Sequence, residues 1–107
     1  MAFTLKQNDT SPAMTATLQD AAGAPVNLTG ASVRFHTRRN GKAAATVDAA
    51  AVIVNAAAGS VRYNWSPPDT AISGTYQAEF EVTYADGSIE TYPNTGYIDV
   101  VIIDDIA

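Results

Sequence analysis

The sequence predicts an all-β domain, a sandwich or barrel of about eight short strands. One observation behind this prediction is that hydrophobic and polar residues alternate over several short segments, most clearly over residues 75–84. Successive side chains of a strand point to opposite faces, so this alternation is typical of a strand with one buried face. The other observation is that turn-forming residues separate these segments at intervals of roughly 8–12 residues, the spacing of short antiparallel strands.

The alternation places the expected strands in chain order. They cover residues 3–7, 14–18, 33–37, 52–54, 61–65, 75–84, 89–92 and 97–103. Asn40-Gly41 and Asp86-Gly87 accept the positive φ that tight hairpins need, so we expect a hairpin at each. Residues 20–25 predict a loop. Residues 66–69 contain two prolines, which cannot donate hydrogen bonds inside a sheet.

Residues 43–58 permit two interpretations. The segment is rich in alanine, the best helix former. However, Val52, Ile53 and Val54 form a β-branched cluster in its middle. We expect a short strand within a loose connection, and a helix across the edge of the sandwich is the alternative.

The start of the longest alternating segment indicates the type of sandwich. Ser73, Gly74, Thr75 and Tyr76 follow a turn that contains proline and aspartate. In immunoglobulin-like sandwiches, a tyrosine near the start of strand F bonds back to the upstream backbone, an arrangement called the tyrosine corner. We expect Tyr76 to form such a corner, and a plain core tyrosine is the alternative.

Composition limits the classes of protein to which the chain can belong. The 107 residues suffice for one domain, which we expect to span residues 1–107. A net charge of −5 argues against nucleic acid as a partner, and the lack of cysteine excludes disulfides and thiol catalysis. No segment has the length of a membrane span, and the first residues lack the features of a signal peptide. We therefore expect no membrane contact.

No group of residues predicts catalysis. His36 is the single histidine, and no nucleophile or orienting acid lies beside it in the sequence. It also lacks a second histidine or a cysteine with which to bind a metal ion. The sequence therefore predicts a non-enzymatic protein with no cofactor, no metal site and His36 on the surface of a strand.

Basic residues gather in one part of the chain. Four of the six lie within nine positions, at Arg34, Arg38, Arg39 and Lys42. If the strands that contain them are neighbours in the sheet, the side chains at positions 34, 36 and 38 face Glu79 and Glu81. We favour these intramolecular pairs, and a patch that faces a partner is the alternative.

Four aromatic residues permit a second function class. Tyr63, Trp65, Tyr92 and Tyr97 are candidates for a sugar-stacking platform. However, Tyr63 and Trp65 alternate onto the same face as Val61, and the interior of a sandwich commonly holds a large aromatic side chain. We therefore favour a core position for Tyr63 and Trp65.

Residues 97–103 are largely apolar on both faces, with Asp99 as the charged exception, which a strand with one face in water should not be. This pattern makes Tyr97, Val101 and Ile103 candidates for contact with another subunit, and burial within the chain is the alternative. Such a strand can also lend its edge to a neighbouring sheet.

Several longer segments resemble one protein family. Residues 6–12 read K-Q-N-D-T-S-P, similar to the family's K-Q-G/N-D-T-x-P start. Residues 18–35 read L-Q-D-A-A-G-A-P-V-N-L-T-G-A-S-V-R-F, similar to its L-x-D-x-x-G-x-P-V-D/N-L-T-G-A-x-V-x-F signature. Residues 59–65, 69–70, 73–82 and 86–94 resemble its later half. The family is that of the N-terminal domain of phage baseplate upper proteins, with related small virion proteins.

This resemblance implies an immunoglobulin-like antiparallel β-sandwich of about 7–9 short strands. It implies a non-enzymatic structural component of a tailed-phage virion, assembled in the host cytoplasm, and it brings no catalytic motif or cofactor. We expect a tail-tip, baseplate or fibre-attachment adaptor that docks as a homo-oligomer on other phage structural proteins. A capsid decoration protein and a carbohydrate-binding or adhesion module are the alternatives. The expected interface residues are Tyr97, Val101, Ile103, Arg34 and Arg38.

Overall fold

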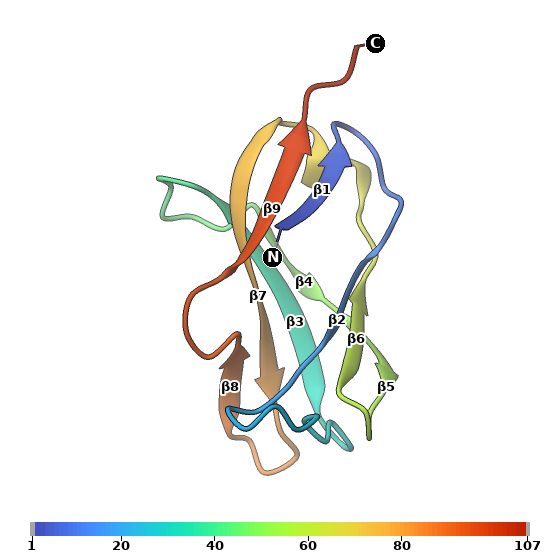
Figure 1. Cartoon of the computed structure of the whole chain (residues 1–107), viewed down its shortest axis with the longest axis vertical. Coiled ribbons are helices and arrows are strands. Elements are labelled where there is room, and N and C mark those ends of the chain that lie inside the picture. Colours follow the sequence, from blue (N-terminus) through green and yellow to red (C-terminus); the bar gives the residue numbers. More distant parts are fainter. Residues whose placement is uncertain (1, 107) are drawn as a thin grey trace.

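The computed structural model describes residues 2–106 as two packed β-sheets, which confirms the predicted all-β sandwich (Figure 1). The strands are β1 Ala2–Lys6, β2 Met14–Thr17, β3 Ser32–Arg39, β4 Val47–Ala50, β5 Val52–Asn55, β6 Ser60–Tyr63, β7 Gly74–Thr83, β8 Ile89–Tyr92 and β9 Ile98–Ile103. A short 3-10 helix, η1 Pro67–Thr70, follows β6 at the two prolines.

The larger sheet has the order β1-β9-β7-β3-β4, and β8 also pairs with β7. The ten-residue β7 is long enough to pair with β9 near its start and with β8 near its end. The first strand, β1, lies parallel to β9, whereas the other paired strands are antiparallel (Figure 1). The smaller sheet has the order β2-β6-β5, so β2 is one of its edges.

The core lies between the two sheets and is built around an aromatic cluster. Phe35 of β3 stacks on Tyr63 of β6 with ring centroids 4.6 Å apart, and its centroid is 4.9 Å from Phe80 of β7. Trp65 meets Phe35 edge-on at 5.6 Å. Phe35, Phe80, Tyr63 and Trp65 are all buried, as the alternation predicts. A sugar platform built on Tyr63, Trp65 and Tyr92 is therefore wrong, because these three side chains lie in the core.

The alanine-rich segment forms two strands where one was expected, and its helical alternative is wrong. β4 pairs with β3 in the larger sheet, and β5 pairs with β6 in the smaller one. Between them, the Ala51 amide donates to the Val33 carbonyl at 2.9 Å. Val47 is buried and Ile53 packs against the core, so each strand supplies one sheet with an inward aliphatic residue. A helix over these residues would leave these two sheet edges without their strands.

The tyrosine corner is present. The Tyr76 hydroxyl donates to the Ile72 carbonyl, four residues upstream, at 2.6 Å. Gly74 adopts φ 146°, a conformation that side-chain-bearing residues rarely adopt, and a Cβ there would lie 3.1 Å from the Arg39 guanidinium. This corner fixes the entry of β7 and hence the register of its neighbours.

The two predicted hairpin turns differ. Asp86-Gly87 joins β7 to β8 in a short turn, with the Tyr84 amide donating to Ser88 at 2.8 Å. Asn40-Gly41 also forms a turn, but β4 begins only at Val47, so the predicted tight hairpin is wrong there. The register explains the difference. The pairing of β3 with β4 stops at Thr37 and Val47, β3 continues to Arg39 beside β7, and residues 40–46 span the connection.

Candidate interaction surface

The five expected interface residues lie on one surface, the outer face of the larger sheet, which points away from the smaller sheet. Arg34 and Arg38 alternate with buried residues of β3, and Val101 and Ile103 alternate with buried residues of β9. Tyr97 lies just before β9 and meets Arg38 across β7. The topology thus brings Arg38 and Tyr97, which are 59 positions apart in sequence, within hydrogen-bonding distance. Arg34 and Ile103 lie toward opposite ends of the same face, because Arg34 pairs with Glu81 of β7 and Ile102 pairs with Gly74.

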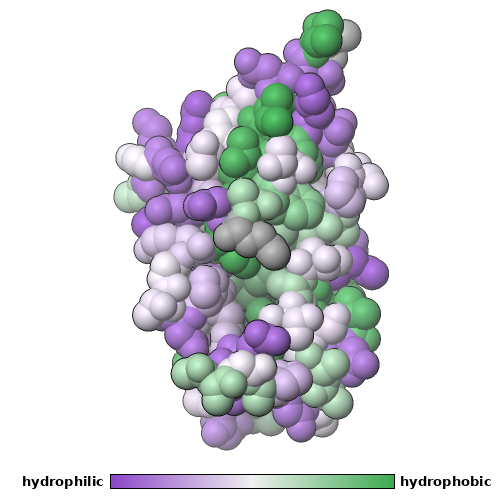
Figure 2. Space-filling model, in the orientation of Figure 1, coloured by the Kyte–Doolittle hydropathy of each residue, from purple (hydrophilic) through white to green (hydrophobic). Residues whose placement is uncertain are grey.

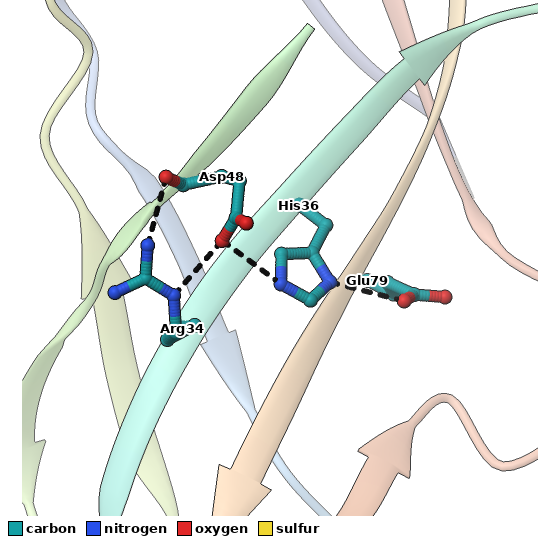
Figure 3. Close-up of polar contacts among 4 residues, drawn as sticks. All are labelled: Arg34, His36, Asp48 and Glu79. Atoms are coloured by element: carbon teal, nitrogen blue, oxygen red, sulfur yellow. Dashed lines mark hydrogen bonds and ion pairs between the residues drawn. The ribbon is translucent and has the colours of Figure 1, made fainter. Parts of the chain in front are cut away.

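A charged row crosses three strands in one part of this face (Figure 3). His36 lies between two carboxylates, with Nε2 3.2 Å from Asp48 Oδ1 and Nδ1 3.2 Å from Glu79 Oε2. The protonated ring can donate to both oxygens, whereas a neutral ring can donate to only one. The predicted pairing of His36 with Glu79 is confirmed, and His36 is half-buried between its neighbours.

Arg34 has a different partner from the one expected. It lies opposite Glu81 in the register, but its Nε donates to Asp48 Oδ1 at 2.8 Å and its Nη2 donates to the Asp48 carbonyl at 2.9 Å (Figure 3). The hydrogen bond from Arg34 lowers the pKa of the Asp48 carboxyl below its ordinary value. Asp48 was not among the expected partners, because the segment that forms its strand, β4, was expected to be a loose connection.

Arg38 connects the charged row to Tyr97. Its Nε donates to Gln77 Oε1 at 2.9 Å, and its Nη2 donates to the Tyr97 hydroxyl at 3.1 Å. The guanidinium carbon also lies 5.2 Å from the centroid of the Tyr97 ring, within the range of a cation–π interaction. Arg38 therefore holds an exposed aromatic ring in place. The expectation that Arg38 pairs with Glu79 or Glu81 is wrong.

A shallow hollow of about 230 Å³ lies over this part of the face, lined by charged side chains, Tyr97 and two alanines of the connection between β3 and β4. Its carboxylates already accept from Arg34 and His36. Among residues 2–106, no group of three or more histidine and acidic side chains has the geometry of a metal site.

The part of the face over β9 is largely apolar, although the exposed Asp99 lies on it between Tyr97 and Val101. Tyr97 is 47% exposed and Ile103 is 42% exposed, and Val101 is half-buried. Figure 2 shows hydrophobic residues gathered over the upper part of β9. Burial within the chain, the alternative for these residues, is wrong for Ile103. The expectation that this strand lends its edge is also wrong, because β1 and β7 pair with both sides of β9.

A β-sandwich with a tyrosine corner and a mixed charged and aliphatic outer face belongs to the class of immunoglobulin-like modules. The family profile described as the BppU N-terminal domain, the N-terminal domain of baseplate upper protein, matches residues 3–103. The chain therefore belongs to this family, as its sequence motifs predict. No curated protein matches the chain.

Membership of this family suggests a structural role in the phage baseplate, without catalysis. It implies a component of the virion that interacts with other phage structural proteins. In the part of the chain that the structure describes, no helix has the length and hydrophobicity needed to cross a membrane.

Proposed function

We propose that this protein is a non-enzymatic adaptor of a tailed-phage tail tip, baseplate or fibre attachment, which docks through the outer face of its larger sheet. The proposal rests on two observations taken together. The family profile matches residues 3–103, and aliphatic and aromatic side chains are exposed on one face of the larger sheet. Tyr97, Val101 and Ile103 form the centre of the interface, and Arg34 and Arg38 lie at its border.

The chemistry of the face suits docking. Interfaces have an apolar centre and a polar border, and Tyr and Arg are enriched in them. Tyr97 is already held by Arg38, so little side-chain entropy is lost when a partner covers the ring. Arg34 and Asp48 neutralise each other at the border, which lowers the cost of bringing that border close to another protein.

A homo-oligomer in the particle is part of this proposal. A stable interface buries about 1,200–2,000 Å² in total, so the face must meet a second copy or another structural protein over most of its extent. Assembly takes place in the host cytoplasm and the protein remains in the virion. A capsid decoration protein would use the same chemistry. Labelling this protein and locating it on the particle, at the tail or at the head, distinguishes an adaptor from a decoration protein. A sugar-binding role has less support, because Tyr63 and Trp65 are buried.

The test compares two matched double variants in phage assembly. Val101→Asp/Ile103→Asp places charges in the proposed interface, and Val52→Asp/Val54→Asp places them on β5 of the other sheet, where both valines are exposed. We expect the first variant to lose its oligomeric state in sedimentation and to be absent from purified particles, and the second to assemble normally. Equal assembly of the two variants would show that the outer face is not the docking surface.

A further inference from the structure

The free edge of β2 offers a second kind of binding site, which adjoins the outer face and shares Tyr97 with it. β2 pairs with β6 on one side only. The Leu18 amide donates to the Gly59 carbonyl at 2.8 Å, in the same register as the β2–β6 pairs. In an antiparallel ladder, alternate residues direct their backbone groups to the partner strand. Met14 and Ala16 therefore face β6, and Thr15 and Thr17 direct their N–H and C=O groups to the open side.

These backbone groups have no partner within the fold. Among residues 2–106, no backbone hydrogen bond joins Thr15 or Thr17 to any segment on the open side of β2. Native proteins commonly cover or block such edges, because unpaired N–H and C=O groups are a template for another strand. Here the edge carries small, β-branched threonines and neither proline nor charge.

A groove with apolar and hydroxyl-bearing walls runs along this edge. A space of about 550 Å³ is lined by β2 and Ser60 of β6 on one side and by Tyr97 and Ile98 on the other. A second space of about 210 Å³ continues it past Leu18 to Tyr92 and Pro93. The opposite wall is the connection between β8 and β9, where residues 93–97 leave the sheet. The groove therefore offers an added strand two things. The unpaired N–H and C=O groups of β2 can pair with its backbone, and the walls of the groove can contact its alternate side chains.

Two acidic residues lie next to the far end of the groove. Asp20 follows Gln19 and accepts from the amides of Ala22 and Ala24, and Glu90 accepts from Tyr92, and both Gln19 and Tyr92 line this end. Within the described part of the chain, the ion pairs involve Asp48 and Glu79, so neither Asp20 nor Glu90 has a cationic partner. A bound strand with Lys or Arg at this end would supply the missing charge.

We propose that the groove beside β2 binds an extended, β-branched segment of a partner protein, which adds as a fourth strand to the smaller sheet and places a basic residue beside Asp20 and Glu90. Strand addition takes its affinity from main-chain hydrogen bonds and its specificity from pockets for alternate side chains. A second copy of this chain fits less well, because each copy carries a net charge of −5.

The experiment uses the full chain and a defined probe, the peptide acetyl-Lys-Thr-Val-Thr-Val-Thr-amide. An antiparallel peptide places its first residue beside the acidic end, so the same peptide with Glu first is the matched control. With the Lys peptide at millimolar concentration, we expect amide exchange of Thr15 and Thr17 to slow by about tenfold or more. The Glu peptide should bind about threefold more weakly at low salt, because like charges then meet.

Two variants separate strand addition from adsorption to the groove. Thr17→Pro removes a backbone donor that the fold leaves unpaired, a place where an edge strand tolerates proline, and Thr17→Val keeps the donor. We expect Thr17→Pro to weaken peptide binding by about tenfold and Thr17→Val to leave it nearly unchanged. Thr15→Pro repeats the test at the other free donor.

Three results would overturn the proposal. The first is that the amide exchange rates of Thr15 and Thr17 do not change when the peptide is added. The second is that a folded Thr17→Pro variant binds the peptide as tightly as the wild type. The third is that these amides become protected without peptide as the protein dimerises. The last result would assign the edge to a second copy. Val101→Asp/Ile103→Asp should still bind the peptide, so failure of the outer face and failure of this groove are distinguishable.

Discussion

The inner and outer faces of the larger sheet are made by the same strands but differ in burial and in the contacts of their side chains. On the inner face, Phe35, Phe80 and Val100 are at most 1% exposed and pack against the smaller sheet. On the outer face, the neighbours of these residues in sequence form a charged row and an exposed aliphatic strip. Alternation alone therefore fixes which residues are buried, whereas the partners of the outward side chains depend on which strands are adjacent.

Two adjacent valines provide the largest test of this difference. Val100 is 1% exposed and Val101 is half-buried on the opposite face. Val100→Ala should lower the free energy of unfolding by about 2 kcal/mol, because buried methyl groups are lost and a cavity remains. Val101→Ala should cost less than about 1 kcal/mol. Urea denaturation of both variants checks this, and equal losses would contradict the assignment of β9 to two different environments.

Two tyrosines, one on each face, provide the next test. Tyr76→Phe removes the hydroxyl that donates to Ile72 and should cost about 1–2 kcal/mol of unfolding free energy. Tyr97→Phe removes a hydroxyl on an exposed ring that accepts from Arg38 and should change the stability by about 0.5 kcal/mol or less. Thermal denaturation distinguishes the two. A larger loss in Tyr97→Phe would mean that the corner does not anchor β7.

The smallest effect concerns the ionisation of Asp48. Its pKa is lowered chiefly by the hydrogen bond from Arg34, so its contribution to stability is present above the ordinary value of 3.8 and is lost as the pH falls through the lowered value. Arg34→Ala should raise the pKa of Asp48 towards 3.8, as measured by carboxyl NMR titration. Arg38→Ala is the control, because Arg38 contacts Gln77 and Tyr97. A pKa that is unchanged in Arg34→Ala would show that the pair does not persist in solution.

The residues of the candidate surface could be predicted from the sequence, but the contacts among them could not. The alternation placed Arg34, Arg38 and Val101 on outward faces, because a period of two leaves no other choice once one face is buried. The partner Asp48 could not be predicted, since its segment has the composition of a helix or a loop. Only the antiparallel pairing of β4 with β3 places it beside His36 and Arg34.

The two-layer fold, the tyrosine corner and the family can all be predicted from local spacing in the sequence. The evidence is the alternation of side chains, the glycine before a tyrosine, and the turn residues between strands. The tertiary structure alone decided the parallel pairing of β1 with β9, the charged row and the open edge of β2. These features depend on which distant segments become neighbours. Such contacts are set by the packing of the whole core, and no short segment of the sequence encodes them.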